Sequence, residues 1–181
     1  RKARTHGVRH GTGSFEKVMA WLDEHQPHDV GNCLIHNDFR FDNLVLAHDD
    51  PTRVIGVLDW EMATLGDPLM DLGGALAYWV QADDDRIMRG SRRQPTHAPG
   101  MLTRDEVWQY YAHASGRAIS PKDQLFYEIF GLFRLAVIAQ QIYYRYANGQ
   151  TSNPAFKQFR GMVIYLEWRC RRLMRRAGRL S

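Results

Sequence analysis

A polar stretch between two short apolar runs constrains this chain more than any other part of its sequence. Residues 35–43 read Ile-His-Asn-Asp-Phe-Arg-Phe-Asp-Asn. The apolar runs at 33–35 and 44–47 predict a strand on each side. Because both ends of such a loop are fixed by strands, we expect its polar side chains to meet at one site.

A second polar position belongs to the same unit. Residues 54–58 are apolar and rich in β-branched side chains, which predicts a third strand, and residues 48–51 have the composition of a turn. The strands at 44–47 and 54–58 should therefore form a β-hairpin. Asp59 follows the last strand, where a carboxylate is costly unless it is paired or binds a metal. The hairpin returns it to the loop.

The spacing of the loop residues indicates a particular chemistry. His36, Asp38 and Asn43 form the pattern H-x-D-x-x-x-x-N, which is the spacing of a kinase catalytic loop. Asp38 can accept the proton of an attacking hydroxyl, and the amide oxygen of Asn43 can face a metal ion together with Asp59. Hard oxygen ligands without soft ones indicate Mg²⁺ rather than zinc.

Each piece of this pattern has a simpler explanation when taken alone. An H-x-D sequence is common and usually structural, and Asp42 and Asn43 are ordinary turn residues. The order of strand, loop, strand, turn and strand ending in Asp59 favours the catalytic interpretation over these alternatives.

The loop residues resemble the aminoglycoside phosphotransferase and choline kinase-like family. The resemblance continues through two later segments, Leu58-Asp59-Trp60-Glu61 and Gly66-Asp67-Pro68-Leu69-Met70-Asp71-Leu72. The likeness is densest over residues 31–80 and is greatest to the branch that occurs beside, or fused to, acyl-CoA dehydrogenases. It implies an α+β fold: the C-terminal lobe of a protein-kinase-like structure, mostly helical, with a small β-hairpin platform that carries the catalytic loop.

The resemblance also implies roles for individual residues. Asp38 would be the catalytic residue and His36 would hold the loop by hydrogen bonds. The cofactors would be ATP and Mg²⁺, with Asn43 and Asp59 as metal ligands and Glu61 as a second acidic position near the metal. Asp71 would brace the catalytic loop or cap the helix that begins near it.

One residue departs from the family pattern. Asn37 stands where many members have glycine. Asparagine enters the left-handed backbone region more readily than other non-glycine residues, so the change is tolerable if residue 37 has that conformation.

The rest of the chain is predicted to be mainly helical. Ser14 is a plausible N-cap for a helix over 15–25, and Thr103 with Glu106 resembles a capping box. Residues 81–100 have few apolar anchors and predict a mobile loop. The other helices are expected at 69–80, 103–115, 121–146 and 156–176.

The nucleotide-binding part of a kinase does not fit before the loop. Only 35 residues precede His36, which leaves no room for a lysine strand, a helix and further strands. Gly11-Thr12-Gly13-Ser14 imitates a glycine-rich loop, but helical periodicity follows it. We therefore expect residues 1–181 to form the C-terminal lobe, with the N-terminal nucleotide-binding lobe absent and little activity in the isolated chain.

Charge and composition bear on the partners. The net charge is +4, which disfavours a polycationic antibiotic as substrate, so the expected acceptor is another hydroxylated small molecule. Asp83-Asp84-Asp85 could attract a cation but is more typical of a solvated loop. The arginines near the C-terminus are better explained by a solvated helix end than by nucleic-acid binding.

Cellular context follows from cysteine content and hydropathy. Cys33 and Cys170 are far apart, which suits reduced thiols in a cytoplasmic protein. No apolar run suggests a membrane span of about 18 residues.

Two other functions remain open at this level: a kinase-like binding module without catalysis, and a metal-dependent hydrolase. The intact set of Asp38, Asn43 and Asp59 disfavours the first. A two-metal hydrolase usually needs more His and Asp ligands than this cluster offers.

Overall fold

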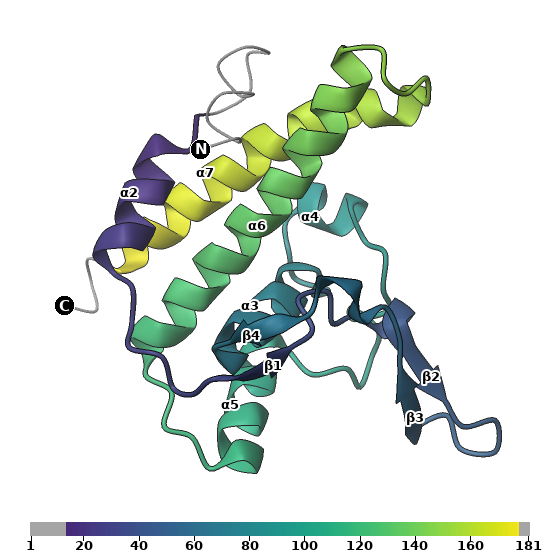
Figure 1. The fold of residues 1–181 in the computed structure, drawn as a ribbon, viewed down its shortest axis with the longest axis vertical. Helices are drawn as coiled ribbons and strands as arrows, with labels where there is room; N and C mark the ends of the chain where they lie inside the picture. Colours follow the sequence, from purple (N-terminus) through teal and green to yellow (C-terminus); the bar gives the residue numbers. More distant parts are fainter. Residues whose placement is uncertain (1–13, 178–181) are drawn as a thin grey trace. The chain divides into compact units, whose positions relative to one another are not determined.

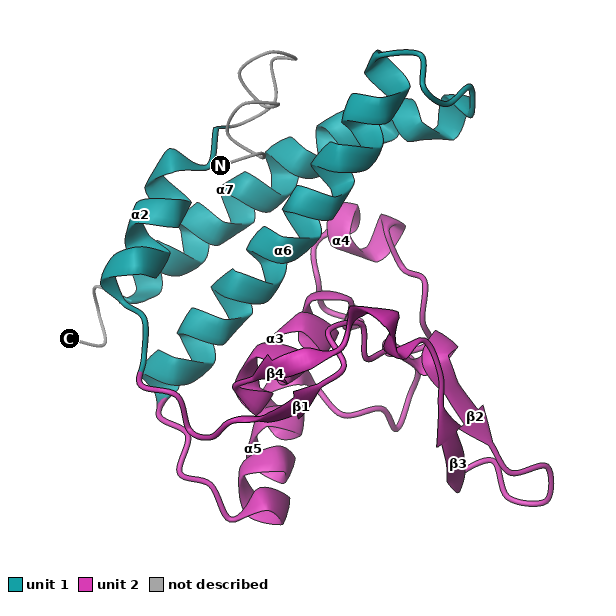
Figure 2. Ribbon diagram, viewed as in Figure 1, with its two compact units in different colours: residues 1–27, 121–181 teal, residues 28–120 magenta. Residues whose placement is uncertain are grey.

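The computed structural model describes residues 14–177 and divides the chain into two compact units (Figure 2). Unit 2 comprises residues 28–120 and contains the predicted catalytic loop. Unit 1 comprises residues 1–27 and 121–181. Gly11-Thr12-Gly13 lies outside the described residues, so its comparison with a glycine-rich loop stays a prediction.

Four short strands form two small sheets in unit 2 (Figure 1). β2 (Leu44–Leu46) and β3 (Val54–Val57) pair antiparallel, which confirms the predicted hairpin. β1 (Cys33–Ile35) pairs antiparallel with β4 (Thr64–Gly66), a strand that the sequence analysis missed because Thr-Leu-Gly forms no apolar run. A Cβ on Gly66 would lie 2.8 Å from Cδ1 of Ile35, so glycine permits this close pairing.

α3 (Pro68–Ala77) follows β4 and carries Asp71. Its N-cap is Asp67, whose side chain accepts a hydrogen bond from the Leu69 N–H at 2.7 Å, and Pro68 occupies the first helical position, where no N–H is needed. The cap also accepts a hydrogen bond from the Val30 N–H at 2.8 Å. Asp67 therefore fixes both the start of the helix and the segment before β1.

The segment expected to be a loop throughout contains α4 (Arg86–Gly90), which corrects that prediction. Met88 is its one buried apolar side chain and the other anchors are polar, so hydrophobic periodicity could not reveal the helix. Asp84 forms a two-pronged ion pair with Arg104, with both N–O distances at 2.8 Å, and Asp85 caps α4. Asp83 accepts a hydrogen bond from the Gln81 side chain at 3.0 Å, so all three adjacent carboxylates have partners in the structure.

α5 (Arg104–Ser115) completes unit 2. The Thr103 hydroxyl accepts a hydrogen bond from the Glu106 N–H, and the Glu106 carboxylate accepts one from the Thr103 N–H, which confirms the predicted capping box. Gly116 ends the helix with a φ of 66°, a conformation that glycine adopts without strain.

Unit 1 is helical. Its described elements are α2 (Glu16–Glu24), α6 (Pro121–Ala147), the short 3₁₀ helix η3 (Pro154–Gln158) and α7 (Phe159–Ala177). Ile129 of α6 and Val163 and Leu166 of α7 are fully buried where these helices pack together. The predicted Ser14 cap is wrong: Phe15 is the N-cap, with φ of 55° and no side-chain cap. Its ring is buried beside Phe133, so core packing sets the start of α2.

α6 meets the length and hydropathy criteria for a membrane span, which the sequence analysis did not anticipate. Half of its most apolar window is buried inside the structure. A core helix of a folded domain has the same property, and the packing of α6 against α7 and α2 accounts for its apolar character.

Candidate active site

Asp71 ties the start of the loop to α3. Its two carboxylate oxygens accept hydrogen bonds from the backbone N–H groups of His36 at 2.6 Å and Asn37 at 2.8 Å. Of the two roles considered for Asp71, these bonds are those of a brace, while Asp67 caps the helix. Asn37 has a φ of 65°, the left-handed conformation in which a glycine-to-asparagine change is tolerable.

His36 connects the loop to the end of β3. The ring is 2% exposed, and Nε2 lies 2.7 Å from the carbonyl oxygen of Leu58. Nδ1 accepts a hydrogen bond from the Asp38 N–H at 3.2 Å, so the pattern requires the tautomer protonated on Nε2. With both nitrogens used by backbone groups, His36 is suited to holding the loop.

Asn43 joins the far end of the loop to Asp38. Its amide nitrogen donates to the Asp38 carbonyl oxygen at 2.8 Å and to the Asp38 carboxylate at 3.3 Å. Only the NH₂ group can donate twice, so these bonds fix the orientation of the amide. The Oδ1 atom of Asn43 is left as an acceptor beside the Asp38 carboxylate.

Asp59 is held close to the same loop through its neighbour. Leu58 donates its N–H to the Asn43 carbonyl oxygen at 2.8 Å and accepts from His36. Asp59 itself has a φ of 66°, which is strained for a non-glycine residue. Its carboxylate is exposed and makes no hydrogen bond or ion pair with the described residues. A carboxylate presented in this way can serve as a ligand.

Glu61 lies in the 3₁₀ helix η2 (Trp60–Met62), which follows Asp59 directly. Its side chain is exposed and has no partner among the described residues. The ring of Trp60 packs on His36 with the centroids 4.7 Å apart, which fixes η2 against the loop.

Arg40 is a charged neighbour of the site that the sequence analysis did not single out. Its Nε lies 3.4 Å from the Asp38 carboxylate, its NH2 lies 3.7 Å from that of Asp42, and its guanidinium stacks 5.0 Å above the Tyr78 ring. The signal was an arginine two positions after Asp38, but its partner Tyr78 is known only from the fold.

The donor set fits a magnesium ion that is also held by other oxygen ligands. Within residues 14–177, no three His, Cys, Asp or Glu side chains are placed to hold a metal. The predicted set is one amide oxygen, one carboxylate and the adjacent Glu61. Mg²⁺ is commonly bound by one or two carboxylates with water and phosphate oxygens completing its shell. The free Oδ1 of Asn43 and the unpaired carboxylate of Asp59 match that requirement.

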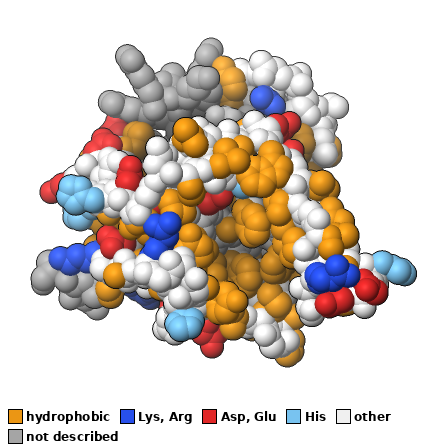
Figure 3. Space-filling view, turned by 60° about the horizontal axis from the view of Figure 1, so that its bottom comes forward, with side chains coloured by type: hydrophobic (Ala, Val, Ile, Leu, Met, Phe, Trp, Pro, Cys, Tyr) orange, Lys and Arg blue, Asp and Glu red, His pale blue; other side chains and the backbone are white. Residues whose placement is uncertain are grey.

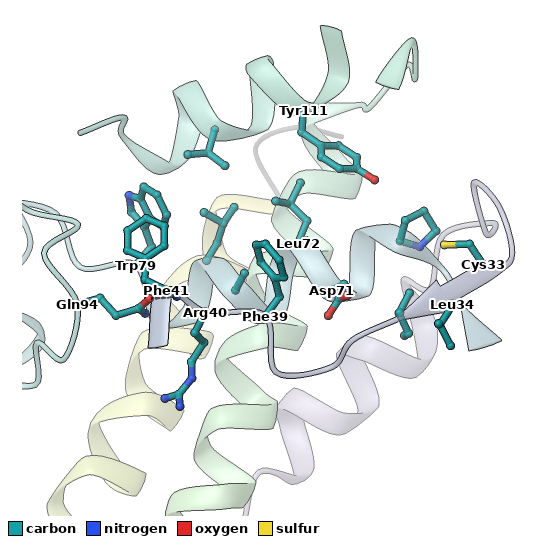
Figure 4. Close-up of a pocket in the computed structure, with 15 residues that line it drawn as sticks. Cys33, Leu34, Phe39, Arg40, Phe41, Asp71, Leu72, Trp79, Gln94 and Tyr111 are labelled. Atoms are coloured by element: carbon teal, nitrogen blue, oxygen red, sulfur yellow. Dashed lines mark hydrogen bonds between the residues drawn. The ribbon is translucent and has the colours of Figure 1, made fainter. Parts of the chain in front are cut away.

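A pocket of about 470 Å³ opens beside the loop (Figure 4). Phe39, Arg40 and Phe41 form one side, and β1, α3, α5, Trp79 and Gln94 contribute the remainder. Burial raises the pKa of Tyr111 on its α5 wall, so that phenol stays protonated. The sequence analysis did not identify this pocket, because its lining comes from segments far apart in the chain.

Known proteins match this chain in sequence. Residues 3–107 match the model of the "Phosphotransferase enzyme family". The chain is 38% identical over 147 residues to mouse "Acyl-CoA dehydrogenase family member 10". This match covers 80% of this chain and 13% of that protein. It is 36% identical over 153 residues to human "Acyl-CoA dehydrogenase family member 11", 83% of this chain and 19% of that protein. The chain therefore spans less than a fifth of these relatives.

A solved structure shares the fold. A Ralstonia eutropha protein assigned by name to the aminoglycoside phosphotransferases superposes with a TM-score of 0.71 and 30% identity. The match covers 93% of this chain and 53% of that one. The predicted family resemblance and kinase-like fold class are confirmed by these findings.

Proposed function

We infer the function of this chain from one premise: it belongs to the phosphotransferase enzyme family. Family and fold indicate a kinase-like phosphotransferase. We propose that the chain carries the catalytic residues for transfer of the γ-phosphoryl group of ATP to a hydroxyl of a small molecule. Within this proposal, nucleotide and hydroxylated acceptor are its partners, and a cytoplasmic location remains a prediction.

One observation carries the proposal: Asn43 binds Asp38 through its NH₂ group. The contact places the Asp38 carboxylate, which is 27% exposed, beside the free oxygen of Asn43. A base and a metal ligand next to each other are what phosphoryl transfer to an alcohol requires. The exposed carboxylate of Asp59, one residue from the Leu58 that Asn43 binds, supplies the second ligand.

The residues divide the work between chemistry and positioning. Asp38 accepts the proton of the acceptor hydroxyl. His36 and Asp71 hold the loop in place, so that Asp38 loses little orientational freedom on reaction. Asn43 and Asp59 would hold Mg²⁺, with Glu61 near enough in sequence to assist. The metal, when bound, neutralises charge on the phosphates.

The proposal also requires a nucleotide-binding lobe supplied by polypeptide outside this chain. Large apolar side chains on and beside the strands are strongly exposed, among them Leu34 (60%), Ile55 (59%) and Leu65 (69%). Clustered exposed apolar side chains mark an interaction surface. A lobe that packs there would bury them and place the nucleotide next to Asp59.

The decisive experiment compares two aspartates of the same loop in the full-length protein. Both Asp38 and Asp42 lie close to Arg40. Asp38→Asn should lower alcohol-dependent ATP consumption by about 10²–10⁴-fold, the usual contribution of a general base. Asp42→Asn, the matched control, should change it less than about threefold. Equal effects of the two substitutions would remove Asp38 from the chemistry.

The same assay separates the alternatives. ATP loss without an added alcohol would favour a metal-dependent hydrolase. No ATP loss in the full-length protein under any acceptor would favour a kinase-like binding module.

A further inference from the structure

We propose that the pocket beside the catalytic loop binds the apolar portion of the acceptor, which makes the acceptor class uncharged alcohols that carry a hydrocarbon arm. The inference rests on the proposed phosphotransferase function, since only that function gives the pocket an acceptor to bind. It goes further by assigning a binding site and a chemical class.

The position of the pocket links it to the chemistry. Phe39, Arg40 and Phe41 line it and follow Asp38 directly in the chain. In Figure 4 the ring of Phe39 stands among the lining side chains, and Tyr111 reaches in from α5. A volume of about 470 Å³ suits a small organic molecule. Asp38 is not itself a lining residue, but the three residues after it are, so a ligand held there lies against the loop that carries the base.

The walls are mostly hydrocarbon. Aliphatic and aromatic side chains from the loop, β1, α3 and α5 make up most of the lining: Leu34, Ile35, Phe39, Phe41, Leu72, Ala75, Leu76, Trp79 and Val107. Figure 3 shows hydrophobic side chains gathered around a hollow on one face of the molecule, with most charged groups toward its edges. Such walls stabilise a ligand in proportion to the apolar area it buries.

Each charged side chain of the pocket already has a partner within the protein. Both oxygens of Asp71 accept backbone hydrogen bonds. In Figure 4 the guanidinium of Arg40 points away from Phe39, Phe41 and Trp79, and it lies close to the carboxylates of Asp38 and Asp42. Asp71 and Arg40 are therefore less available to a polyamine or an anionic ligand, even though the buried Nε of Arg40 lacks a hydrogen-bond partner. An uncharged ligand fits this balance.

Two donors remain for a polar group on the ligand. Gln94 uses its side-chain oxygen to accept from the Phe41 N–H at 2.9 Å, and its NH₂ group has no partner among the described residues. The hydroxyl of Tyr111 is likewise unpaired within residues 14–177. By contrast, the Trp79 N–H is used by the Leu102 carbonyl. The pocket can thus orient an oxygen-bearing group at its edge while the walls hold the hydrocarbon.

The test uses butane-1,2-diol, hexane-1,2-diol and octane-1,2-diol with the full-length protein. Binding without ATP is measured by saturation-transfer NMR, and phosphorylation by ATP consumption. Each added methylene that the pocket buries should raise affinity and kcat/KM about fourfold. Spermidine, a polyamine of comparable length, should not compete.

Variants locate the effect. Ala75→Phe fills the pocket from α3 and should abolish the dependence on chain length. Ala114→Phe, on the exposed side of α5, is the matched control and should leave that dependence unchanged. Leu72→Ala enlarges the pocket and should shift the preference toward the longest diol, a gain that misfolding cannot produce.

The outcomes separate this inference from the proposed function. Binding that rises with chain length and is lost in Ala75→Phe supports the pocket assignment even if no diol is phosphorylated, and the phosphotransferase proposal is then decided by the Asp38→Asn comparison described above. Phosphorylation without chain-length dependence overturns the assignment. Equal diol binding by the wild type and Ala75→Phe would also overturn the assignment. An apolar polypeptide segment of the full-length protein that fills the pocket would overturn it as well.

Discussion

At the residue scale, Asp71 makes the clearest case for a side chain that acts through another. Asp71→Asn removes the charge and turns an NH₂ group toward a backbone donor, so one of its two hydrogen bonds is lost. We expect the free energy of unfolding to fall by about 1.5–3 kcal/mol and kcat to fall more than about tenfold, because the loop geometry loosens.

Thermal unfolding and steady-state kinetics check this prediction. Asp105→Asn, at an exposed position in the first turn of α5, is the control and should alter neither quantity appreciably. Full stability together with full activity in Asp71→Asn would show that the brace is dispensable.

Cys170 carries a prediction about alkaline pH. Burial raises the pKa of its thiol from 9.0 to about 12. Between these values the unfolded chain releases the proton and the folded chain keeps it, so the free energy of unfolding falls as pH rises, by about 1.4 kcal/mol per pH unit. Cys170→Ala removes this contribution.

The measurement is the denaturant stability of both proteins from pH 8 to about pH 11. The wild type should lose more stability than Cys170→Ala above pH 9, whatever their difference at pH 8. Cys33 is exposed and serves as the internal comparison, because alkylating reagents should reach it alone in the folded protein. Parallel stability curves would contradict the assignment.

At the scale of elements, the capping box decides where α5 begins. Thr103→Ala leaves the Glu106 N–H without its partner and should cost about 1 kcal/mol of stability. Thr103→Ser keeps the hydroxyl and should retain most of that stability. Chemical denaturation of the two variants measures the difference, and identical losses would show that packing rather than the cap fixes α5.

At the scale of the whole molecule, the exposed strand surface predicts weak nucleotide binding by this chain alone. Asn43 and Asp59 provide few ligands, and the described residues form no metal cluster of their own. Titration of the isolated chain with ATP and Mg²⁺ should give a Kd above about 1 mM, equivalent to no more than about 4 kcal/mol. Full-length protein should bind more tightly. Tight binding by the isolated chain would make a second lobe unnecessary.

The sequence by itself determined the local order of this protein. The strands around the loop, the hairpin, the α5 capping box and the long helices follow from residue periodicity and short-range hydrogen bonding, which act between neighbours in the chain. The proximity of Asn43 and Asp38 follows from the same local turn.

Tertiary structure decided what depends on distant partners. Four features join residues that are far apart in the chain. They are the pairing of β4 with β1, the anchoring of the α4 segment by Arg104, the start of α2 at the buried Phe15, and the pocket between the loop, α3 and α5. No local pattern encodes such contacts, because burial and long-range pairing are properties of the folded chain as a whole.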